Sequence, residues 1–520
     1  MVRLGRWGWW LAVVLGVLVV AGCSSSGGHA ASKGGSTSSP QTTGYTVPSP
    51  EVSRPAAEGK GVNRPQPSPP LPPGYSEHEF FIGGTATSFT ADKTPDSGFW
   101  TVTPGTKANY RTRVIVRQPP ASKFSGTVLV EWFNVSAIEA SPDWAYLSQQ
   151  IGREGDVYIG VSAQAQGVEG GGTLLNTNTQ NAAKLGISVS KNGLKHIDPV
   201  RYGSLVHPGD AYSYDIFSQV GQAAKKSSAT LLGGLKPKKV LGVGESQSAA
   251  FLTTYVDAVH PVDPVYDGFL IHSRGNGGAP LDGKFTAASA QQQATQHLLI
   301  RTDLAVPVFM FETETDLTLL GYSQALQPDT KTVHTWEVAG TSHADAHLIR
   351  AVIGGPRDPS VGSFLGCTTP INTGPQHEVI QAGLRHFVQW AGGGDPPPTA
   401  TRLHIVRAGN GVSIARDSNG NALGGVRNPM LDVPTATLTG EPPAGTTGAD
   451  VAKTAEGTCL LFGRTTPFDH AKLVQLYGNA DNYVARFRKS ANKAVTAGFL
   501  LRTDADELIA EAEANRALFK

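Results

Sequence analysis

The sequence predicts an α/β fold, in which helices cover both faces of a mostly parallel sheet. Short runs rich in valine, isoleucine and aromatic residues alternate with helical segments, which is typical of this layered class. The runs that we predict as strands are 78–89, 108–118, 127–135, 156–164, 238–246, 267–273, 306–313 and 332–340. The first two follow one another without a helix between them and should form an antiparallel edge. We therefore expect a sheet of about eight strands.

The N-terminus has the features of an export signal. Arg3 and Arg6 precede an apolar run, 11–20, that is too short to span a bilayer as a helix. The run ends in the sequence VAGC, which resembles the bacterial lipobox, where the cysteine thiol is lipidated. We expect residues 1–22 to be a lipoprotein signal peptide and Cys23 to anchor the protein on the extracytoplasmic face of the cytoplasmic membrane. The alternative is ordinary signal cleavage near Gly22.

Three further regions follow the signal. Residues 23–72 are rich first in serine and glycine and then in proline, which predicts a disordered spacer. Residues 73–398 form the predicted core. Residues 399–520 contain too many apolar side chains for a free tail, so we expect a C-terminal extension packed on the core. The segments expected to build a cap are 165–208, 275–305, parts of 344–375 and the extension.

Composition excludes several classes of function. Forty-three lysines and arginines balance 42 aspartates and glutamates, a net charge of +1, so we predict no nucleic-acid partner. Three cysteines in 520 residues exclude a disulfide scaffold and a cysteine-rich zinc module. We predict no metal site, no organic cofactor and no protein partner.

One serine lies in a context that gives it chemical meaning. The sequence GESQS, 244–248, fits the pattern G-x-S-x-[GS], which by itself is weak because it recurs elsewhere in this chain. At Ser246, however, a buried strand precedes the pattern and an apolar helix follows it. A sharp turn from strand to helix exposes a serine hydroxyl and requires small residues, here Gly244 and Ser248. We predict Ser246 as a nucleophile.

A nucleophilic serine needs a base and an acid that orients the base. His343 lies in a glycine-containing loop after the last predicted strand, and Asp316 follows the strand before it. Glu314 is the alternative acid, and Glu312 is a weaker one. The order serine, aspartate, histidine is that of α/β-hydrolases. For the oxyanion hole we expect the backbone N–H of Gln247 and one N–H near Asn134 and Val135.

The chain also resembles a known family. The motifs that carry the resemblance are EWFNVS (131–136), SPDW (141–144), GVSAQ (160–164), GVEG (167–170), YSYDIFSQ (212–219), GESQS (244–248), ETETD (312–316), GGVR (424–427) and DVP (432–434). They look like a bacterial branch of α/β-hydrolase-domain proteins. The resemblance spans about 75–515 and implies the α/β-hydrolase fold with cap insertions and the C-terminal extension. It says little about the substrate.

These observations predict a lipid-anchored serine hydrolase, and we expect a carboxylic-ester hydrolase acting on a small-molecule or lipid ester. An acyltransferase with the same triad and a non-catalytic binding lipoprotein are the alternatives. Cys367 and Cys459 would be the thiols left after lipidation of Cys23 in an oxidising compartment, so we expect a disulfide between them, with two separate buried thiols as the alternative.

Overall fold

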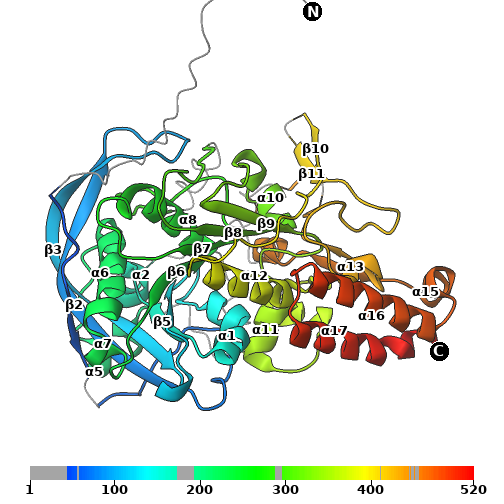
Figure 1. Cartoon of the computed structure of the whole chain (residues 1–520), viewed down its shortest axis with the longest axis horizontal. Helices are drawn as coiled ribbons and strands as arrows, with labels where there is room; N and C mark the ends of the chain where they lie inside the picture. Colours follow the sequence, from blue (N-terminus) through cyan, green and yellow to red (C-terminus); the bar gives the residue numbers. More distant parts are fainter. Residues whose placement is uncertain are drawn as a thin grey trace, which may run out of the picture. The chain divides into compact units, whose positions relative to one another are not determined.

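The computed structural model describes residues 44–520 apart from 56–57, 172–191, 287–295, 410, 444, 447–449 and 451–455. Its centre is a nine-stranded sheet in the order β1-β2-β3-β5-β4-β6-β7-β8-β9 (Figure 1). The strands are β1 Glu51–Ser53, β2 Ser76–Ala91, β3 Val102–Gln118, β4 Thr127–Trp132, β5 Val157–Val161, β6 Lys239–Glu245, β7 Phe269–His272, β8 Val308–Thr313 and β9 Val333–Val338. The predicted strands correspond to β2 through β9, and the α/β class is confirmed.

The sheet is antiparallel at one end and parallel through the rest. β1, β2, β3 and β5 pair antiparallel in that order, whereas β5, β4, β6, β7, β8 and β9 pair in parallel. The carboxyl ends of parallel strands meet at one edge of a sheet, where ligands of such folds bind. Ser246, Asp316 and His343 follow β6, β8 and β9, so the topology brings all three to this edge.

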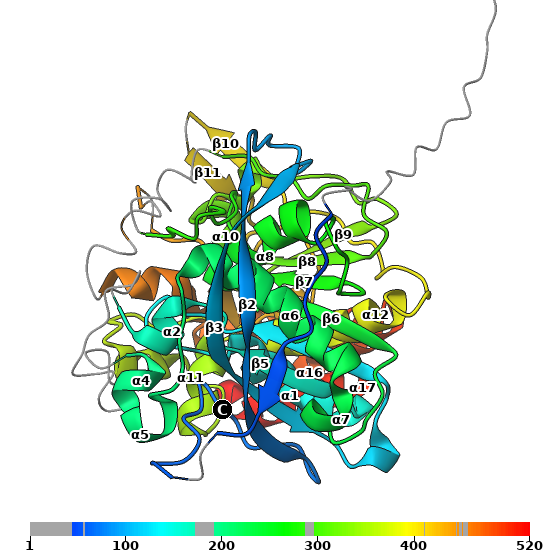
Figure 2. The same ribbon diagram turned by 90° about the vertical axis from the view of Figure 1, so that its left-hand side faces the viewer.

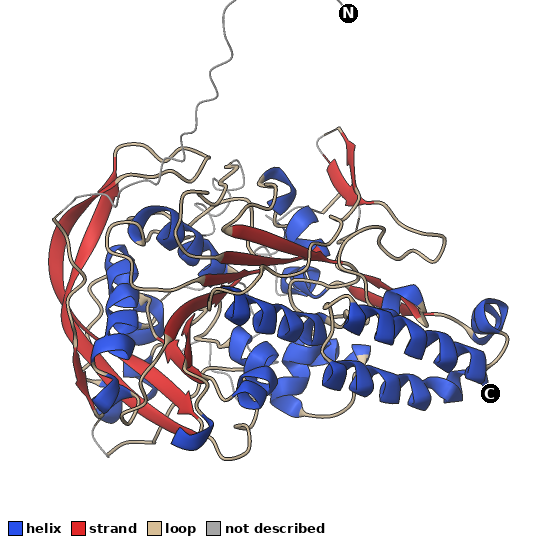
Figure 3. Ribbon diagram, viewed as in Figure 1, coloured by secondary structure: helices blue, strands red, loops and turns tan. Residues whose placement is uncertain are grey.

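Helices cover both faces of the sheet (Figure 3). The helices of the core are α1 Pro142–Glu154, α2 Ala165–Glu169, α4 Leu194–Ile197, α5 Pro199–Tyr202, α6 Ser213–Lys226, α7 Ser228–Leu231, α8 Gln247–Thr254, α10 Glu314–Thr318, α11 Ala346–Ile353 and α12 Gln376–Trp390. Along β4, Val128, Val130 and Trp132 pack in one core with side chains of α6 and α8. Leu129 packs in a second core with side chains of α1 and α12. This period of two shows that the strand is buried on both sides.

The prediction of a disordered spacer over 23–72 is wrong for the residues from 44 onward that the structure describes. Residues 44–55, which we call the strap, lie against the edge of the sheet (Figure 2), where β1 pairs with β2 from Glu51 opposite Gly83 to Ser53 opposite Phe81. Val47 is buried in the core. Serine and proline predict disorder because they bury little apolar surface, but an edge strand also offers unpaired backbone groups that an extended segment can satisfy. Residues 58–72 of the predicted spacer are described as well, and Gln66 pairs with Ala140 of the core. Residues 23–43 and 56–57 lie outside the described residues.

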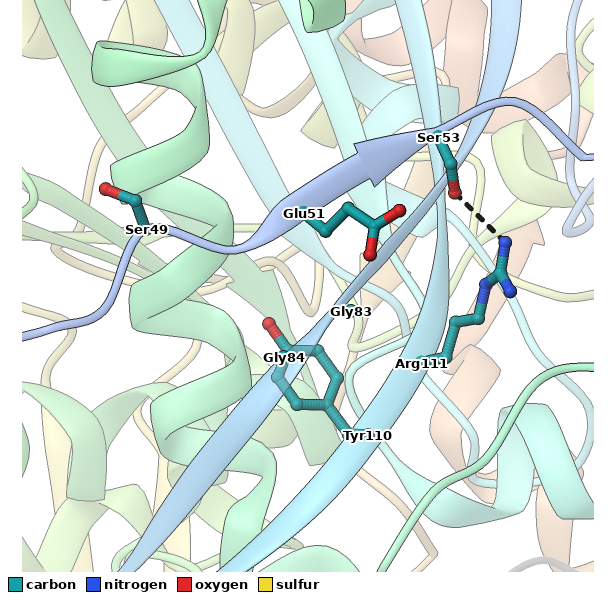
Figure 4. Close-up of a pocket in the computed structure, with 7 residues that line it drawn as sticks. All are labelled: Ser49, Glu51, Ser53, Gly83, Gly84, Tyr110 and Arg111. Carbon is teal, nitrogen blue, oxygen red and sulfur yellow. Dashed lines mark hydrogen bonds between the residues drawn. The ribbon is translucent and has the colours of Figure 1, made fainter.

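A small cavity of about 290 Å³ opens beside the strap (Figure 4). It is lined by Ser49, Glu51, Ser53, Gly83, Gly84, Tyr110 and Arg111. Its polar groups are partly paired, since Arg111 Nη2 donates to Ser53 Oγ at 3.1 Å. None of the lining residues belongs to the site that the sequence predicts.

The C-terminal extension, 399–520, is folded. Its elements are β10 Ile405–Ala408, β11 Gly411–Ile414, α13 Pro429–Asp432, β12 Ala436–Thr439, β13 Arg464–Pro467, α15 His470–Tyr477, α16 Ala480–Thr496 and α17 Arg502–Ala514. Residues 400–480 contain two antiparallel strand pairs, whose four-residue strands are too short to show a period in the sequence. Tyr483 and Phe487 of α16 pack in the same core as α12.

Several predicted segments lie wholly or partly outside the described residues. These are the signal peptide 1–22, the lipidation site Cys23, and the parts of the predicted cap at 172–191 and 287–295. Within the described part of the chain, no helix has both the length and the apolar character needed to cross a membrane.

Candidate active site

Ser246 occupies a strained turn between β6 and α8. Its φ of 60° and ψ of −119° lie in a region that residues other than glycine rarely adopt. The Ser246 N–H donates to the His272 carbonyl of β7 at 3.0 Å, which fixes the turn at the edge of the sheet. A Cβ atom on Gly244 would lie 3.2 Å from the carbonyl oxygen of Ser248. The strand and helix are thus close enough to require a small residue there, as the sequence pattern predicts.

The structure brings the three predicted side chains into one line. His343 Nε2 lies 2.7 Å from Ser246 Oγ, and His343 Nδ1 lies 2.7 Å from Asp316 Oδ1. Because an ionised carboxylate only accepts hydrogen bonds, Nδ1 carries the proton and Nε2 is the acceptor for the serine hydroxyl. His343 and Asp316 are buried and Ser246 is half-buried. This arrangement can remove a proton from the serine.

Asp316 is held in place by its own turn, residues 313–316, which we call the acid loop. The N–H and the Oγ1 hydroxyl of Thr313 both donate to Asp316 Oδ2, each at 2.7 Å. Asp316 is the third residue of α10, and Thr313 caps that helix in a reciprocal capping box. One carboxylate oxygen is therefore occupied by Thr313, and the other is directed at His343.

Glu314, the alternative acid, contacts other partners. Its Oε1 accepts from the backbone N–H of Gly340 at 2.6 Å, and its Oε2 accepts from Arg416 at 2.9 Å. Residues 339–345, which we call the histidine loop, therefore contact the Glu314 side chain through Gly340 and its N–H through the Thr341 carbonyl at 3.3 Å, and not through His343. Glu312, the weaker alternative, lies within β8, and burial raises its pKa well above the usual range. Of the three acids considered, the geometry favours Asp316.

The backbone amides predicted as oxyanion donors differ in their hydrogen-bond partners. The Asn134 N–H donates to the Ala140 carbonyl at 3.0 Å, so this amide is already paired with the backbone. The Val135 N–H faces the side chain of Gln247, whose Oε1 accepts from it at 3.3 Å. The Gln247 N–H begins α8, where the first amides have no carbonyl partner within the helix. Val135 and Gln247 are thus neighbours, and their two amides are the candidate donors.

Comparison with protein families identifies the chain. The model of the family described as alpha/beta hydrolase domain matches residues 47–510. The chain belongs to this family. The match begins within the strap and ends within α17, so the strap and the extension are part of the unit that defines these hydrolases. The large, mostly parallel sheet of the alpha/beta hydrolase fold is the one described above.

Solved structures similar to this hydrolase include several esterases. One of two fungal esterases from Rhizomucor miehei matches with 9% identity over 62% of this chain and 87% of that chain, at a TM-score of 0.29. A glucuronoyl esterase from Solibacter usitatus matches with 12% identity over 56% and 82%, at 0.27. An S-formylglutathione hydrolase from Agrobacterium tumefaciens matches with 9% identity over 52% and 88%, at 0.26. No curated protein matches the chain.

One residue of the hydrolase site escapes the sequence analysis. Glu245 precedes the nucleophile and is buried, with Oε1 3.6 Å from His343 Nε2. Asn134 Nδ2 donates to the Glu245 carbonyl at 3.2 Å, so the side chain of Asn134 supports the turn. Burial raises the pKa of Glu245 well above its usual range. The sequence feature that could have identified Glu245 is its charge, because it directly follows the apolar run 240–244 of β6.

The two remaining predicted site residues are cysteines. Cys459 lies in the extension, and Cys367 lies in the core segment between α11 and α12. Cys367 and Cys459 form a disulfide, with their Cα atoms 5.6 Å apart. Leu461, two residues after Cys459, accepts a hydrogen bond from the N–H of Ala344 at 3.0 Å. The disulfide therefore fastens the segment that contacts the histidine loop directly after His343.

Proposed function

We propose that this hydrolase is a serine carboxylic-ester hydrolase that works through an acyl-enzyme on Ser246. The observation that carries the proposal is the line of two 2.7 Å contacts from Ser246 through His343 to Asp316, on a strained turn at the end of β6. A serine hydroxyl is a poor nucleophile near neutral pH unless a base takes its proton. His343 Nε2 is the base placed to do so.

The proposed reaction has two halves. Ser246 Oγ attacks the ester carbonyl carbon while His343 Nε2 takes its proton, and Asp316 stabilises the resulting imidazolium. His343 then returns the proton to the leaving alkoxide, which departs as an alcohol and leaves the acyl group on Ser246. A water molecule attacks the acyl-enzyme with His343 again as the base, which releases the carboxylic acid and restores the serine.

The negative charge that develops on the carbonyl oxygen needs donors. We assign this role to the backbone amides of Gln247 and Val135, because backbone donors fixed in advance stabilise such a charge without reorganisation. In the resting protein the Val135 amide is occupied by the carboxamide oxygen of Gln247 at 3.3 Å. The substrate oxygen would replace that contact, so the Gln247 side chain must turn aside as the tetrahedral intermediate forms.

We also propose that the hydrolase is a lipoprotein anchored through Cys23 on the outer side of the cytoplasmic membrane. The lipobox-like sequence at the end of the apolar run supports this placement. The disulfide between Cys367 and Cys459 is consistent with it, because such bonds persist in oxidising compartments outside the cytoplasm. The substrate would be a small-molecule ester or a lipid ester that is accessible from the membrane surface.

Labelling of the purified full-length chain with a fluorophosphonate tests the mechanism. We expect covalent labelling of the wild type and none of Ser246→Ala or His343→Ala, whereas Ser248→Ala, which alters the neighbouring serine of the same turn, should still label. Labelling that survives Ser246→Ala would overturn the assignment. Hydrolysis of p-nitrophenyl esters of graded length, with and without an acceptor alcohol, would then separate an esterase from an acyltransferase.

A further inference from the structure

The extension contacts both loops that carry the acid and the base of the candidate site. Ala344 N–H of the histidine loop donates to the Leu461 carbonyl at 3.0 Å. Thr315 Oγ1 of the acid loop donates to the Gly440 carbonyl at 2.6 Å. The residues that make these bonds lie directly after His343 and directly before Asp316 in the sequence. Small displacements of the extension are therefore passed to both loops.

A single carboxylate joins the two loops and the extension. Glu314, in the acid loop, accepts at Oε1 from the Gly340 N–H of the histidine loop at 2.6 Å. At Oε2 it accepts from Arg416 Nη2 at 2.9 Å and from the Gly440 N–H at 3.1 Å, both in the extension. The residue that the sequence offered as a rival acid thus connects the three segments.

The charge on Arg416 is what allows this carboxylate to act as an acceptor. Glu314 is completely buried, and burial raises its pKa while Arg416 beside it opposes that rise. Removing one member of a buried ion pair leaves an uncompensated charge or forces protonation. A protonated Glu314 has fewer acceptor positions for the amides of Gly340 and Gly440. The position of Gly340, near the start of the histidine loop, therefore depends on Arg416 of the extension.

The position of Gly340 matters for the base. Gly340 has a φ of 75°, a conformation that favours glycine, and it begins the turn that leads to His343. A Cβ atom at Gly340 would lie 2.5 Å from Leu431 Cδ2 of the extension, so the turn is packed closely on that side as well. The geometry of His343 against Asp316 is consequently set where Gly340 meets Glu314.

We propose that Glu314 and Arg416 are positioning residues, through which the C-terminal extension holds the histidine loop against the acid loop for the reaction. The inference rests on the proposed serine mechanism. It gives the extension a part in catalysis that does not require contact with the substrate, because correct placement of the reacting groups contributes strongly to the rate.

The chain offers a matched control for the test. Arg402 of the extension also pairs with a completely buried glutamate of the core, Glu337, at 3.4 Å, and with a second acid, Asp329, at 2.7 Å. Arg416 pairs in the same way with Glu314 and, at 2.7 Å, with Glu441. Glu337, however, lies within β9 and outside both loops. Arg402→Ala thus removes a comparable ion pair that does not join the acid loop to the histidine loop.

We expect Arg416→Ala to slow fluorophosphonate labelling and to lower kcat on a p-nitrophenyl ester by at least about tenfold, with KM changed by less than about twofold. Arg416→Lys and Glu314→Gln should give intermediate rates, and they keep the test usable if Arg416→Ala does not fold. Arg402→Ala should lower the melting temperature but label at the wild-type rate within about twofold.

Two results would overturn the inference. The first is that a folded Arg416→Ala protein, or both milder variants, labels at the wild-type rate. The second is that Arg402→Ala slows labelling as much as Arg416→Ala does, since that would indicate a general effect of stability. A folded wild type that does not label at all would instead refute the proposed serine mechanism, and the inference with it.

Discussion

His272 Nδ1 lies 2.9 Å from Asp143 Oδ1, so the protein contains a second buried histidine–aspartate pair beside the one formed by His343 and Asp316. The His272 carbonyl accepts the N–H of Ser246, and its other ring nitrogen lies 3.1 Å from Gln376 Nε2. Burial lowers the pKa of His272 to about 3, so its ring is neutral near pH 7. Both ring nitrogens are occupied, and we assign this pair a packing role.

The first prediction separates the two pairs. His272→Gln should lower the free energy of unfolding by about 1–3 kcal/mol, because it disturbs a buried hydrogen-bonded group. Fluorophosphonate labelling should continue within about tenfold of the wild-type rate, since the backbone carbonyl that holds Ser246 remains. His343→Gln should abolish labelling, because it removes the base that takes the serine proton. Thermal melts and labelling rates, measured on the same preparations, test whether His272 has a packing role. Loss of labelling in a folded His272→Gln protein would contradict that assignment.

The second prediction concerns the acid. Asp316→Asn should lower kcat/KM by about 10³–10⁴, because a carboxamide neither stabilises the imidazolium nor fixes the required tautomer. Asp345→Asn is the control, since Asp345 is also a buried aspartate of the histidine loop but accepts from Tyr146 at 3.1 Å. It should retain activity within about tenfold. Comparable losses in both variants would mean that Asp316 has no special role.

The third prediction concerns the disulfide. Cys367 and Cys459 are separated by 92 residues, and closing a loop of this size restricts the unfolded chain. Cys459→Ser should lower the apparent free energy of unfolding by about 2–5 kcal/mol in urea under oxidising conditions. Cys367→Ser should give the same loss, and the double variant should be no worse than either. An unchanged urea midpoint on reduction of the wild type would contradict this prediction.

The fourth prediction is a pH dependence. His377 and His347 stack with ring centroids 3.8 Å apart, and burial lowers the pKa of His377 to about 3. The unfolded chain takes up a proton at His377 below its ordinary pKa of about 6.5, and the folded chain does not until about pH 3. This contribution to stability is therefore complete above that ordinary pKa and is lost as the pH falls.

Between pH 7 and pH 5 the wild type should thus lose about 2 kcal/mol more than His377→Gln. Glutamine keeps a donor for the Tyr146 carbonyl, which lies 2.7 Å from His377 Nδ1, but it cannot titrate. Urea unfolding of both proteins at the two pH values measures the difference. Parallel losses in wild type and variant would show that His377 is not held neutral.

The parts of this fold and site that could be predicted are those encoded next to one another in the chain. Ser246, Asp316 and His343 each follow a predicted strand, so parallel pairing alone brings them to one edge. The function of Glu314 could not be inferred, because its partner Arg416 is 102 residues away in a segment without a clear period. The strap was missed because its composition does not report the backbone pairing of an edge strand.

The disulfide also changes what a single cut in the chain can do. The bond between Cys367 and Cys459 closes a ring that contains α12 of the core and all of the extension up to η6, the short helix Glu456–Phe462. Cleavage of one peptide bond anywhere in 368–458 therefore opens this ring but leaves both halves covalently joined. Ser246 lies before the ring and α15 to α17 lie after it, so a protease that cuts within it once releases no fragment. Separation of the nucleophile from the C-terminal helices by a cut within this ring would require reduction as well as proteolysis.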